Sequence, residues 1–150
     1  MSPPPARGPA LVALLTVTLA ACAGPTVTTD QYRGKVVQTA KAMSSIIATA
    51  QRAARLDLQG RMLHTVTDTV VSDSERDASS VQTTIESRQP PQDEAADELW
   101  RRIDGPVRDT TRLLTELRIA VRRNDRTAQQ AAADALSAPL DAFRPLSQVA

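Results

Sequence analysis

Apolar residues recur at a helical spacing along nearly the whole chain after residue 28, and this pattern constrains the fold more than any other feature. Placed at about 100° per residue, these residues form four successive stripes, each on one face of a helix. The first stripe contains Tyr32, Val36, Met43, Ile46, Ile47, Ala50 and Ala54. No segment alternates apolar and polar residues over more than a few positions, so we expect no strands. The pattern predicts an all-α chain.

The other three stripes differ in how much apolar area they offer. The second contains Leu63, Val66, Val70, Ser74, Ala78, Val81 and Ile85. The third contains Leu99, Ile103, Val107, Thr110, Leu114, Leu117 and Val121. The fourth contains Ala128, Ala132, Ala135, Leu136, Phe143 and Leu146. Because the fourth is mostly alanine, it can approach its neighbours closely but buries little area. We expect Pro139 and Pro145 to kink or shorten that helix.

Turn and capping residues separate the stripes. Thr28 and Gln31 match a capping box, and the prolines at 90 and 91 end the second stripe. The pair at 124–125, Asn-Asp, offers a stop followed by a new N-cap. These signals predict an antiparallel up-down four-helix bundle with helices at 29–59, 62–88, 92–123 and 125–147. Gly60 is the only clear stop between the first two stripes; without a break there, residues 29–88 would form one long helix and favour a dimer.

The first 21 residues have the anatomy of an export signal. A polar, proline-rich start with one cation, Arg7, precedes an apolar run at 10–19. That run is too short to cross about 30 Å of hydrocarbon as a helix. It fits the apolar region of a signal peptide, and small residues follow it at 20 and 21, where a peptidase would bind.

The four residues Leu19-Ala20-Ala21-Cys22 resemble the lipobox of bacterial lipoproteins. The resemblance implies that Cys22 receives a diacylglyceryl group and that cleavage falls between Ala21 and Cys22. It also implies that the protein is anchored to the cell membrane and faces away from the cytoplasm. We therefore divide the chain into a signal at 1–21, a lipidated Cys22 with a short tether at 22–28, and a bundle domain at 29–150. Ordinary secretion with a coincidental cysteine is the alternative.

A second stretch carries a weaker resemblance. The residues Asp-Ala-Ser-Ser-Val at 77–81, with Ser-Arg-Gln-Pro-Pro at 87–91, look like those of small, uncharacterised helical lipoproteins of high-GC bacteria. This likeness implies a fold and a location, and it brings no reaction, ligand or functional residue with it.

Composition excludes several kinds of site. The chain has one Cys, one His and three aromatic residues, one each of Trp, Tyr and Phe. These numbers argue against a metal centre built from several Cys or His side chains and against a base-stacking surface, so we expect no nucleic-acid partner. No nucleophile elbow, glycine-rich phosphate loop, HExxH or CxxC motif is present. We therefore expect no cofactor and no enzymatic activity.

Isolated titratable residues favour structural roles. His64 is predicted to lie on a helix flank, solvated or with a single hydrogen bond, because it has no second metal ligand. Four carboxylates begin the third helix: Asp93, Glu94, Asp97 and Glu98. Oxygen-rich clusters can bind Ca²⁺, but stabilisation of the helix N-terminus is the simpler account.

Two further carboxylates fall near apolar stripes. Asp57 and Asp77 would be costly to bury without partners, and arginines at 55, 61 and 76 are near them in the sequence. We expect both carboxylates to be paired or to lie at the rim of the core. A catalytic pair would require them to share a cleft, which nothing in the sequence indicates.

The third helix carries the strongest candidate surface. On the face opposite its apolar stripe lie Arg101, Arg108, Arg112, Ile119, Arg122 and Arg123. Residues 101–126 hold 8 Arg against 4 acids, whereas residues 68–98 hold 9 acids against 2 Arg. One interpretation is that the acidic and basic helices attract each other across the bundle surface. The other is that the basic face binds an anionic partner such as lipid headgroups, a wall polymer or an acidic protein.

These observations predict a lipid-anchored, non-enzymatic interaction or structural module of the cell envelope, whose partner is another envelope protein. Self-association stays open. The alternative is a small-molecule-binding or sensing bundle, with a pocket between helices lined by Met43, Met62 and neighbouring apolar residues.

Overall fold

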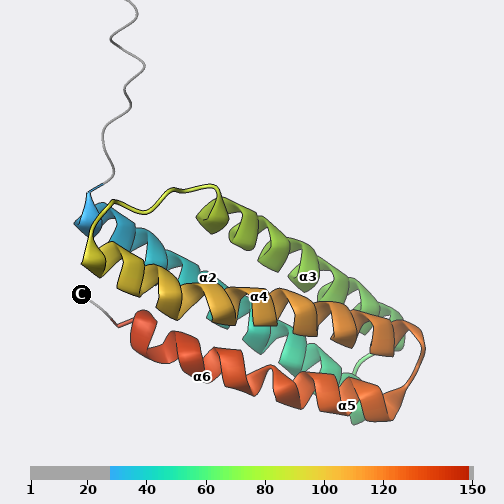
Figure 1. Cartoon of the computed structure of the whole chain (residues 1–150). Helices are drawn as coiled ribbons and strands as arrows, with labels where there is room; N and C mark the ends of the chain where they lie inside the picture. The colour runs from blue at the N-terminus through green and yellow to red at the C-terminus, as the bar shows by residue number, and fades with distance from the viewer. Residues whose placement is uncertain (1–27, 149–150) are drawn as a thin grey trace, which may run out of the picture.

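A computed structural model describes residues 28–148 of the chain, so the predicted signal, Cys22 and most of the tether lie outside the described residues. The described part contains the helices α2 (Thr29–Leu58), α3 (His64–Glu86), α4 (Glu94–Arg122), α5 (Arg126–Ala135) and α6 (Ser137–Leu146). Figure 1 shows them as an antiparallel bundle in which α5 and α6 together form the fourth rod. The predicted all-α four-helix bundle is confirmed, with the last helix divided in two.

Local hydrogen bonds explain where the helices begin and end. The capping box at the start of α2 is present, since the Gln31 amide donates to Thr28 Oγ1 and the Thr28 amide donates to Gln31 Oε1, both at 3.3 Å. Gly60 adopts a left-handed φ of 68°. The Gly60 and Arg61 amides donate to the carbonyls of Asp57 and Leu56, which is a Schellman motif. Gly60 therefore ends α2 and separates it from α3.

The connection after α4 repeats this solution without a glycine. Asn124 takes a left-handed φ of 51°, and its amide donates to the Val121 carbonyl while the Asp125 amide donates to that of Ala120. Asp125 then caps α5 by accepting a hydrogen bond from the Ala128 amide at 2.9 Å. The predicted stop and N-cap at 124–125 are both confirmed.

The break in the fourth rod falls at Leu136, three residues before Pro139. Pro139 has no N–H to donate to the carbonyl one turn earlier, so the regular helical bonding cannot continue there. The side chain of Gln51 on α2 reaches the break, where its Nε2 donates to the Ala133 carbonyl at 2.8 Å and lies 3.2 Å from Ser137 Oγ. A buried amide of α2 therefore hydrogen-bonds to the backbone at the break in the helix.

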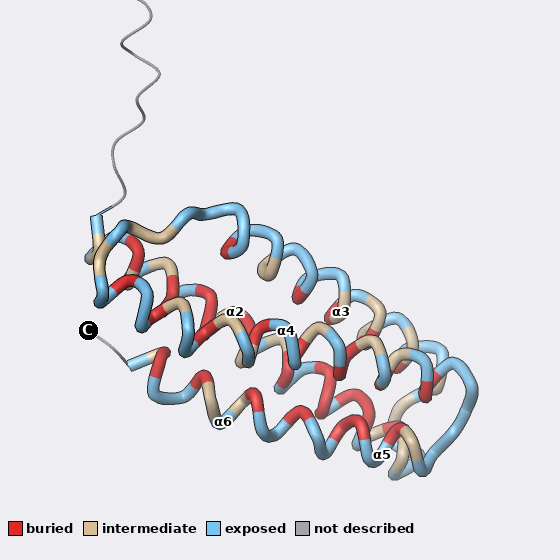
Figure 2. Tube along the Cα trace, in the orientation of Figure 1, coloured by how far each residue is buried: buried red, intermediate tan, exposed pale blue. Residues whose placement is uncertain are grey.

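The core runs along the centre of the bundle, between the inward faces of the helices (Figure 2). On α2 the predicted stripe is buried apart from the half-buried Ile46, and every residue of the predicted α4 stripe is buried. On α3 the prediction is wrong in the first half. Leu63 and Val66 are exposed, and Thr67 and Val71 are buried in their place. On α5 Ala135 is exposed and Ala133 is buried instead.

All three aromatic side chains gather at one end of the bundle. Tyr32 and Phe143 are fully buried, and Trp100 packs partly buried against the same core. Because α2 and α4 begin at this end and α6 finishes there, residues far apart in the sequence meet (Figure 1). We call it the aromatic end. Within residues 28–148, no helix combines the length and the apolarity that crossing a membrane would require.

Candidate functional site

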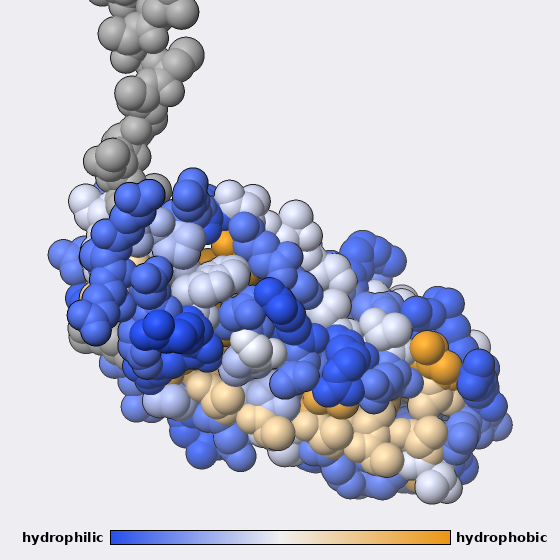
Figure 3. Space-filling view, in the orientation of Figure 1, coloured by the Kyte–Doolittle hydropathy of each residue, from blue (hydrophilic) through white to orange (hydrophobic). Residues whose placement is uncertain are grey.

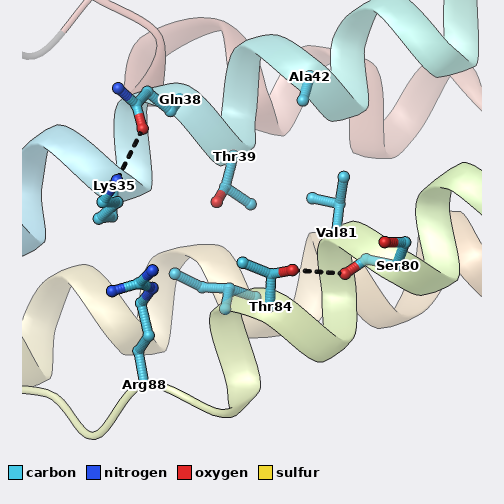
Figure 4. Close-up of a pocket in the computed structure, with 9 residues that line it drawn as sticks. Lys35, Gln38, Thr39, Ala42, Ser80, Val81, Thr84 and Arg88 are labelled. Atoms are coloured by element: carbon cyan, nitrogen blue, oxygen red, sulfur yellow. Dashed lines mark hydrogen bonds between the residues drawn. The ribbon is translucent and has the colours of Figure 1, made fainter.

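A small cleft opens between α2 and α3, toward the aromatic end. Its volume is about 210 Å³. From α2 it is lined by Lys35, Gln38, Thr39 and Ala42, and from α3 by Ser80, Val81, Thr84, Ile85 and Arg88. Figure 4 shows Ala42 and Val81 facing each other from the two helices, with Lys35 and Arg88 together at the other end of the cleft. The cleft thus has an apolar part and a cationic part.

Neither cation of the cleft has an acidic partner within residues 28–148. Lys35 Nζ lies 3.4 Å from the Gln38 side-chain oxygen, and Arg88 makes no side-chain hydrogen bond in that range. This differs from most arginines on α4, which form ion pairs with acids of the same chain. The positive charge of the cleft is therefore available to a ligand.

Two hydroxyl groups of the cleft are also left over from the internal bonding of the helices. Most Ser and Thr side chains on α3 donate to the carbonyl four residues earlier, as Thr84 does to Ser80 at 2.8 Å. The hydroxyls of Thr39 and Ser80 make no such bond among the described residues, although Thr39 is only 9% exposed. Both can donate or accept a hydrogen bond inside the cleft.

The local sequence explains why the cleft opens here. Ala42 leaves room on α2 where a longer side chain would meet Val81. The chain then leaves α3 through a seven-residue connection, 87–93, that contains two prolines. The connections at the opposite end of the bundle are shorter. The helices that precede them, α2 and α4, end in Schellman motifs. The last turn of α3 is therefore joined to α4 by a longer connection than the one that joins its first turn to α2.

A buried polar cluster closes the opposite end, which we call the polar end. Asp57 Oδ2 accepts a hydrogen bond from Gln129 Nε2 at 3.0 Å and lies 3.1 Å from His64 Nδ1. Gln129 is fully buried and also donates to the Ala54 carbonyl at 3.1 Å. The cluster joins α2, α3 and α5. We expected arginines at 55, 61 and 76 as the partners of Asp57; the structure assigns His64 and Gln129 instead.

The cluster resembles part of a catalytic dyad, because a carboxylate orients an imidazole whose other nitrogen is free to act. Such a pair needs a nucleophile within hydrogen-bond reach of that nitrogen. The hydrogen bonds of residues 28–148 place no serine, threonine or cysteine hydroxyl or thiol there. His64 is half-exposed with one hydrogen bond, as the sequence predicts. Asp77 is exposed and does not approach Asp57.

The predicted basic face of α4 is exposed, but most of its charge is already paired. Arg101 binds Glu98 at 2.8 Å, Arg108 binds Asp104 at 3.0 Å, and Arg112 binds both Asp109 and Glu116. Arg122 crosses to Asp68 on α3 at 3.0 Å. Arg123 alone of the five has no ion-pair partner in the described chain. Attraction between the basic and acidic helices is therefore confirmed at Arg122.

A second contact between these helices lies nearer the middle of the bundle. Glu75 on α3 accepts hydrogen bonds from the Thr115 hydroxyl at 2.7 Å and from the Arg118 guanidinium. Burial would raise the pKa of Glu75, but the hydrogen bonds from Thr115 and Arg118 outweigh it and lower the pKa below the ordinary value. Arg118 lies off the predicted basic face, so the helical period alone does not single it out.

The acidic cluster at the start of α4 caps the helix. Asp93 is the N-cap, accepting the Ala96 amide at 2.8 Å and a hydrogen bond from the Thr29 hydroxyl of α2. The bond from Thr29, followed by that from Ala96, lowers the pKa of Asp93. Glu94 and Asp97 lie in the first turn, where negative charge is favourable. Between residues 28 and 148 no group of three or more His, Cys, Asp or Glu side chains is placed to hold a metal ion.

The prediction of a pocket lined by Met43 and Met62 is wrong. Met43 is fully buried in the core, whereas Met62 lies in the connection after α2, about 20 Å further along that helix. The cleft lies instead on the α2–α3 surface, where we did not predict one. One signal was present: the chain has only two lysines, and both, at 35 and 41, are on the first half of α2.

Comparison with protein-family models, with curated proteins and with solved structures finds no match to this chain. Its fold and its cleft define its class, a helical bundle that carries a small cationic cleft on its surface.

Proposed function

We propose that this chain is an exported lipoprotein whose bundle acts as a non-enzymatic interaction module on the outer face of the cell membrane. The lipobox resemblance at 19–22 supports the anchor, and Thr28, the N-cap of α2, follows Cys22 by only six residues. Six extended residues reach at most about 20 Å. The aromatic end would therefore lie near the bilayer, and the polar end would point away from it.

The observation that carries the interaction role is the distribution of exposed apolar side chains. The large hydrophobic residues exposed among those described are Leu63 at 73%, Val66 at 43% and Ile119 at 38%. All three lie at the polar end, where α3 begins and α4 finishes (Figure 1). Figure 3 shows that polar side chains cover most of the face it presents, with isolated apolar spots and a paler band along its lower edge. The gathering of the exposed apolar residues at one end of an otherwise polar bundle supports a contact site at that end.

Arg123 follows Ile119 by one turn of α4 and adds a positive charge that has no ion-pair partner among the described residues. We call Leu63, Val66, Ile119 and Arg123 the distal patch. Its chemistry fits a protein partner that offers apolar side chains bordered by acids, and its place at the membrane-distal end leaves it accessible to another envelope protein.

A photocrosslinking residue at position 66 or 119 of the full-length protein, in its native membrane, tests the contact. We expect a discrete crosslinked species from these positions. Positions 69 and 116, which are exposed on the same two helices, serve as matched controls and should give none. Equal crosslinking from all four positions would contradict the proposal.

The anchor has a separate test. The precursor with Cys22→Ser should leave the membrane fraction, because lipid attachment supplies about 0.8 kcal/mol for each buried CH₂ group. If the variant stays in the membrane after cleavage of its signal, the lipoprotein assignment is wrong, whatever the crosslinking shows.

A further inference from the structure

We infer that the α2–α3 cleft is a binding site for an organic phosphate with a short apolar body. This site lies on a different surface from the distal patch and does not depend on the proposed partner. Three features of the cleft carry the inference: its unpaired charge, the free hydroxyl of Thr39 and its size.

The charge selects an anion. Lys35 and Arg88 lie together at one end of the cleft, and neither has an acidic partner in the part of the chain that the structure describes (Figure 4). Together they supply two positive charges. A phosphomonoester carries about −1.5 to −2 at pH 7 and three acceptor oxygens, so it matches both cations, whereas a carboxylate neutralises only one.

One hydroxyl extends the match to hydrogen bonds. Thr39 lies one turn after Lys35 on α2, and its hydroxyl makes no hydrogen bond within residues 28–148. A phosphate bound by the arginine fork and the lysine still has an oxygen to accept from this hydroxyl, whereas Ser80 lies about 12 Å along α3 from Arg88, beside the apolar part of the cleft. Gln38 already engages Lys35 Nζ at 3.4 Å and positions the ammonium group at the mouth.

The size and the apolar walls set the rest of the ligand. A cavity of about 150 Å³ can hold benzene, so a cleft of about 210 Å³ has room for a body of that size and part of its charged group. Val81 and Ala42 line the part of the cleft away from the cations. An inorganic phosphate would leave these walls empty, so an apolar substituent should strengthen binding.

Phenyl phosphate is the probe that fits these requirements. The protein for the test is residues 22–150 with Cys22→Ser, which retains the complete core, since that core is drawn from residues 32–146. We expect phenyl phosphate to shift the amide resonances of Thr39 and Val81. It should bind more tightly than inorganic phosphate, which lacks the apolar body, and more tightly than benzoate, which has a carboxylate on the same ring.

Variants identify the cleft as the place of binding. Lys35→Gln and Arg88→Gln should each weaken phenyl phosphate binding about tenfold or more, because each removes a charged hydrogen bond. Lys41→Gln and Arg52→Gln remove a cation outside the cleft and should leave binding unchanged. Vesicles containing phosphatidic acid distinguish the source of the phosphate. If only the vesicles bind, with the same dependence on residues 35 and 88, the ligand is a lipid headgroup.

Three results would overturn the inference. The first is that neither phenyl phosphate nor the vesicles bind. The second is that all four variants bind equally well, which would place the anion elsewhere. The third is that benzoate binds as tightly as phenyl phosphate, which would exclude a preference for phosphate.

Discussion

The two ends of the bundle are closed by different chemistry. At the aromatic end Tyr32 and Phe143 are fully buried, and Trp100 packs partly buried against the same core. At the polar end Asp57, His64 and Gln129 link three helices through hydrogen bonds. One end is held by apolar area, which has no directional requirement, and the other by groups that must meet at defined distances.

The difference matches the way the connections are built. Both connections at the polar end are short and satisfy their backbone groups through Schellman motifs. The connection at the aromatic end is longer, with seven residues. Ion pairs between α3 and α4 show a parallel gradient: Arg122 lies 3.0 Å from Asp68 near the polar end, whereas Arg108 lies 3.9 Å from Glu86 near the aromatic end. The α2–α3 cleft opens toward the end with the longer connection and the longer ion pair.

The largest expected effect breaks the aromatic end. Phe143→Ala should lower the free energy of unfolding by about 3–5 kcal/mol, because it removes a fully buried ring and leaves a cavity. Unfolding in denaturant, followed by circular dichroism, measures the change. Arg144→Ala, at the adjacent exposed position, is the control and should change stability by no more than about 0.5 kcal/mol. A loss below about 1 kcal/mol for Phe143→Ala would show that apolar burial does not hold this end.

The next largest effect breaks the polar end. Asp57→Ala should lower the free energy of unfolding by about 1–3 kcal/mol, because the buried Gln129 amide loses an acceptor. The matched control is Asp77→Ala, since Asp77 is exposed and has no ion pair within the described residues. That control should leave stability almost unchanged. Equal effects from the two variants would mean that the hydrogen-bonded cluster contributes nothing beyond ordinary surface charge.

The sequence predicts the buried face of α4 better than the buried face of α3. The α4 stripe could be placed in full, because seven apolar or methyl-bearing positions keep a single register with no competing line. The first half of α3 offers two faces that could be buried, one with Leu63 and Val66 and one with Thr67 and Val71. The face with Leu63 and Val66 is the more apolar, yet it is the one exposed. Thr67 can be buried because its hydroxyl lies 3.4 Å from the Leu63 carbonyl, a partner that side-chain hydropathy does not reveal.

Among the candidate sites, those that depend on one helix could be predicted from the sequence, and those that depend on several helices could not. The exposure of Ile119 and of the arginines around it could be predicted, because it depends only on the period of one helix. The cleft could not, because it requires the register of α3 against α2, which brings Arg88 beside Lys35. The polar cluster requires a third element as well, since Gln129 reaches Asp57 from α5. The apolar period of one helix does not reveal how that helix is shifted along its axis relative to its neighbours.

A smaller effect sharpens the gradient between the two ends. Hydrogen bonds lower the pKa of Glu75 in the folded state, so its contribution to stability is present above the ordinary carboxyl pKa of about 4.3 and is lost as pH falls through the folded-state pKa. Glu75→Gln should cost about 1 kcal/mol at neutral pH. The difference from the native protein should shrink as the solution is acidified below about pH 4. Denaturant unfolding at several pH values measures it, and a difference independent of pH would contradict the assignment.

The smallest effect returns to the aromatic end, where one polar atom is out of place. The Tyr32 hydroxyl is buried and has no hydrogen-bond partner among residues 28–148. Tyr32→Phe keeps the ring and removes that atom, so the free energy of unfolding should stay within about 1 kcal/mol of native or rise.

The same hydroxyl has an alkaline signature. Burial, reinforced by the charges of Asp104 and Asp97, raises the pKa of Tyr32 in the folded state. Stability should therefore be complete below the unfolded-state pKa of about 10 and fall as pH rises through the higher folded-state value. Because the chain has a single tyrosine, ultraviolet absorbance of the phenolate reports this group alone. Titration of the folded protein at the ordinary pKa, or a clear loss of stability in Tyr32→Phe, would mean that the hydroxyl has a partner and that the aromatic end also depends on a directed bond.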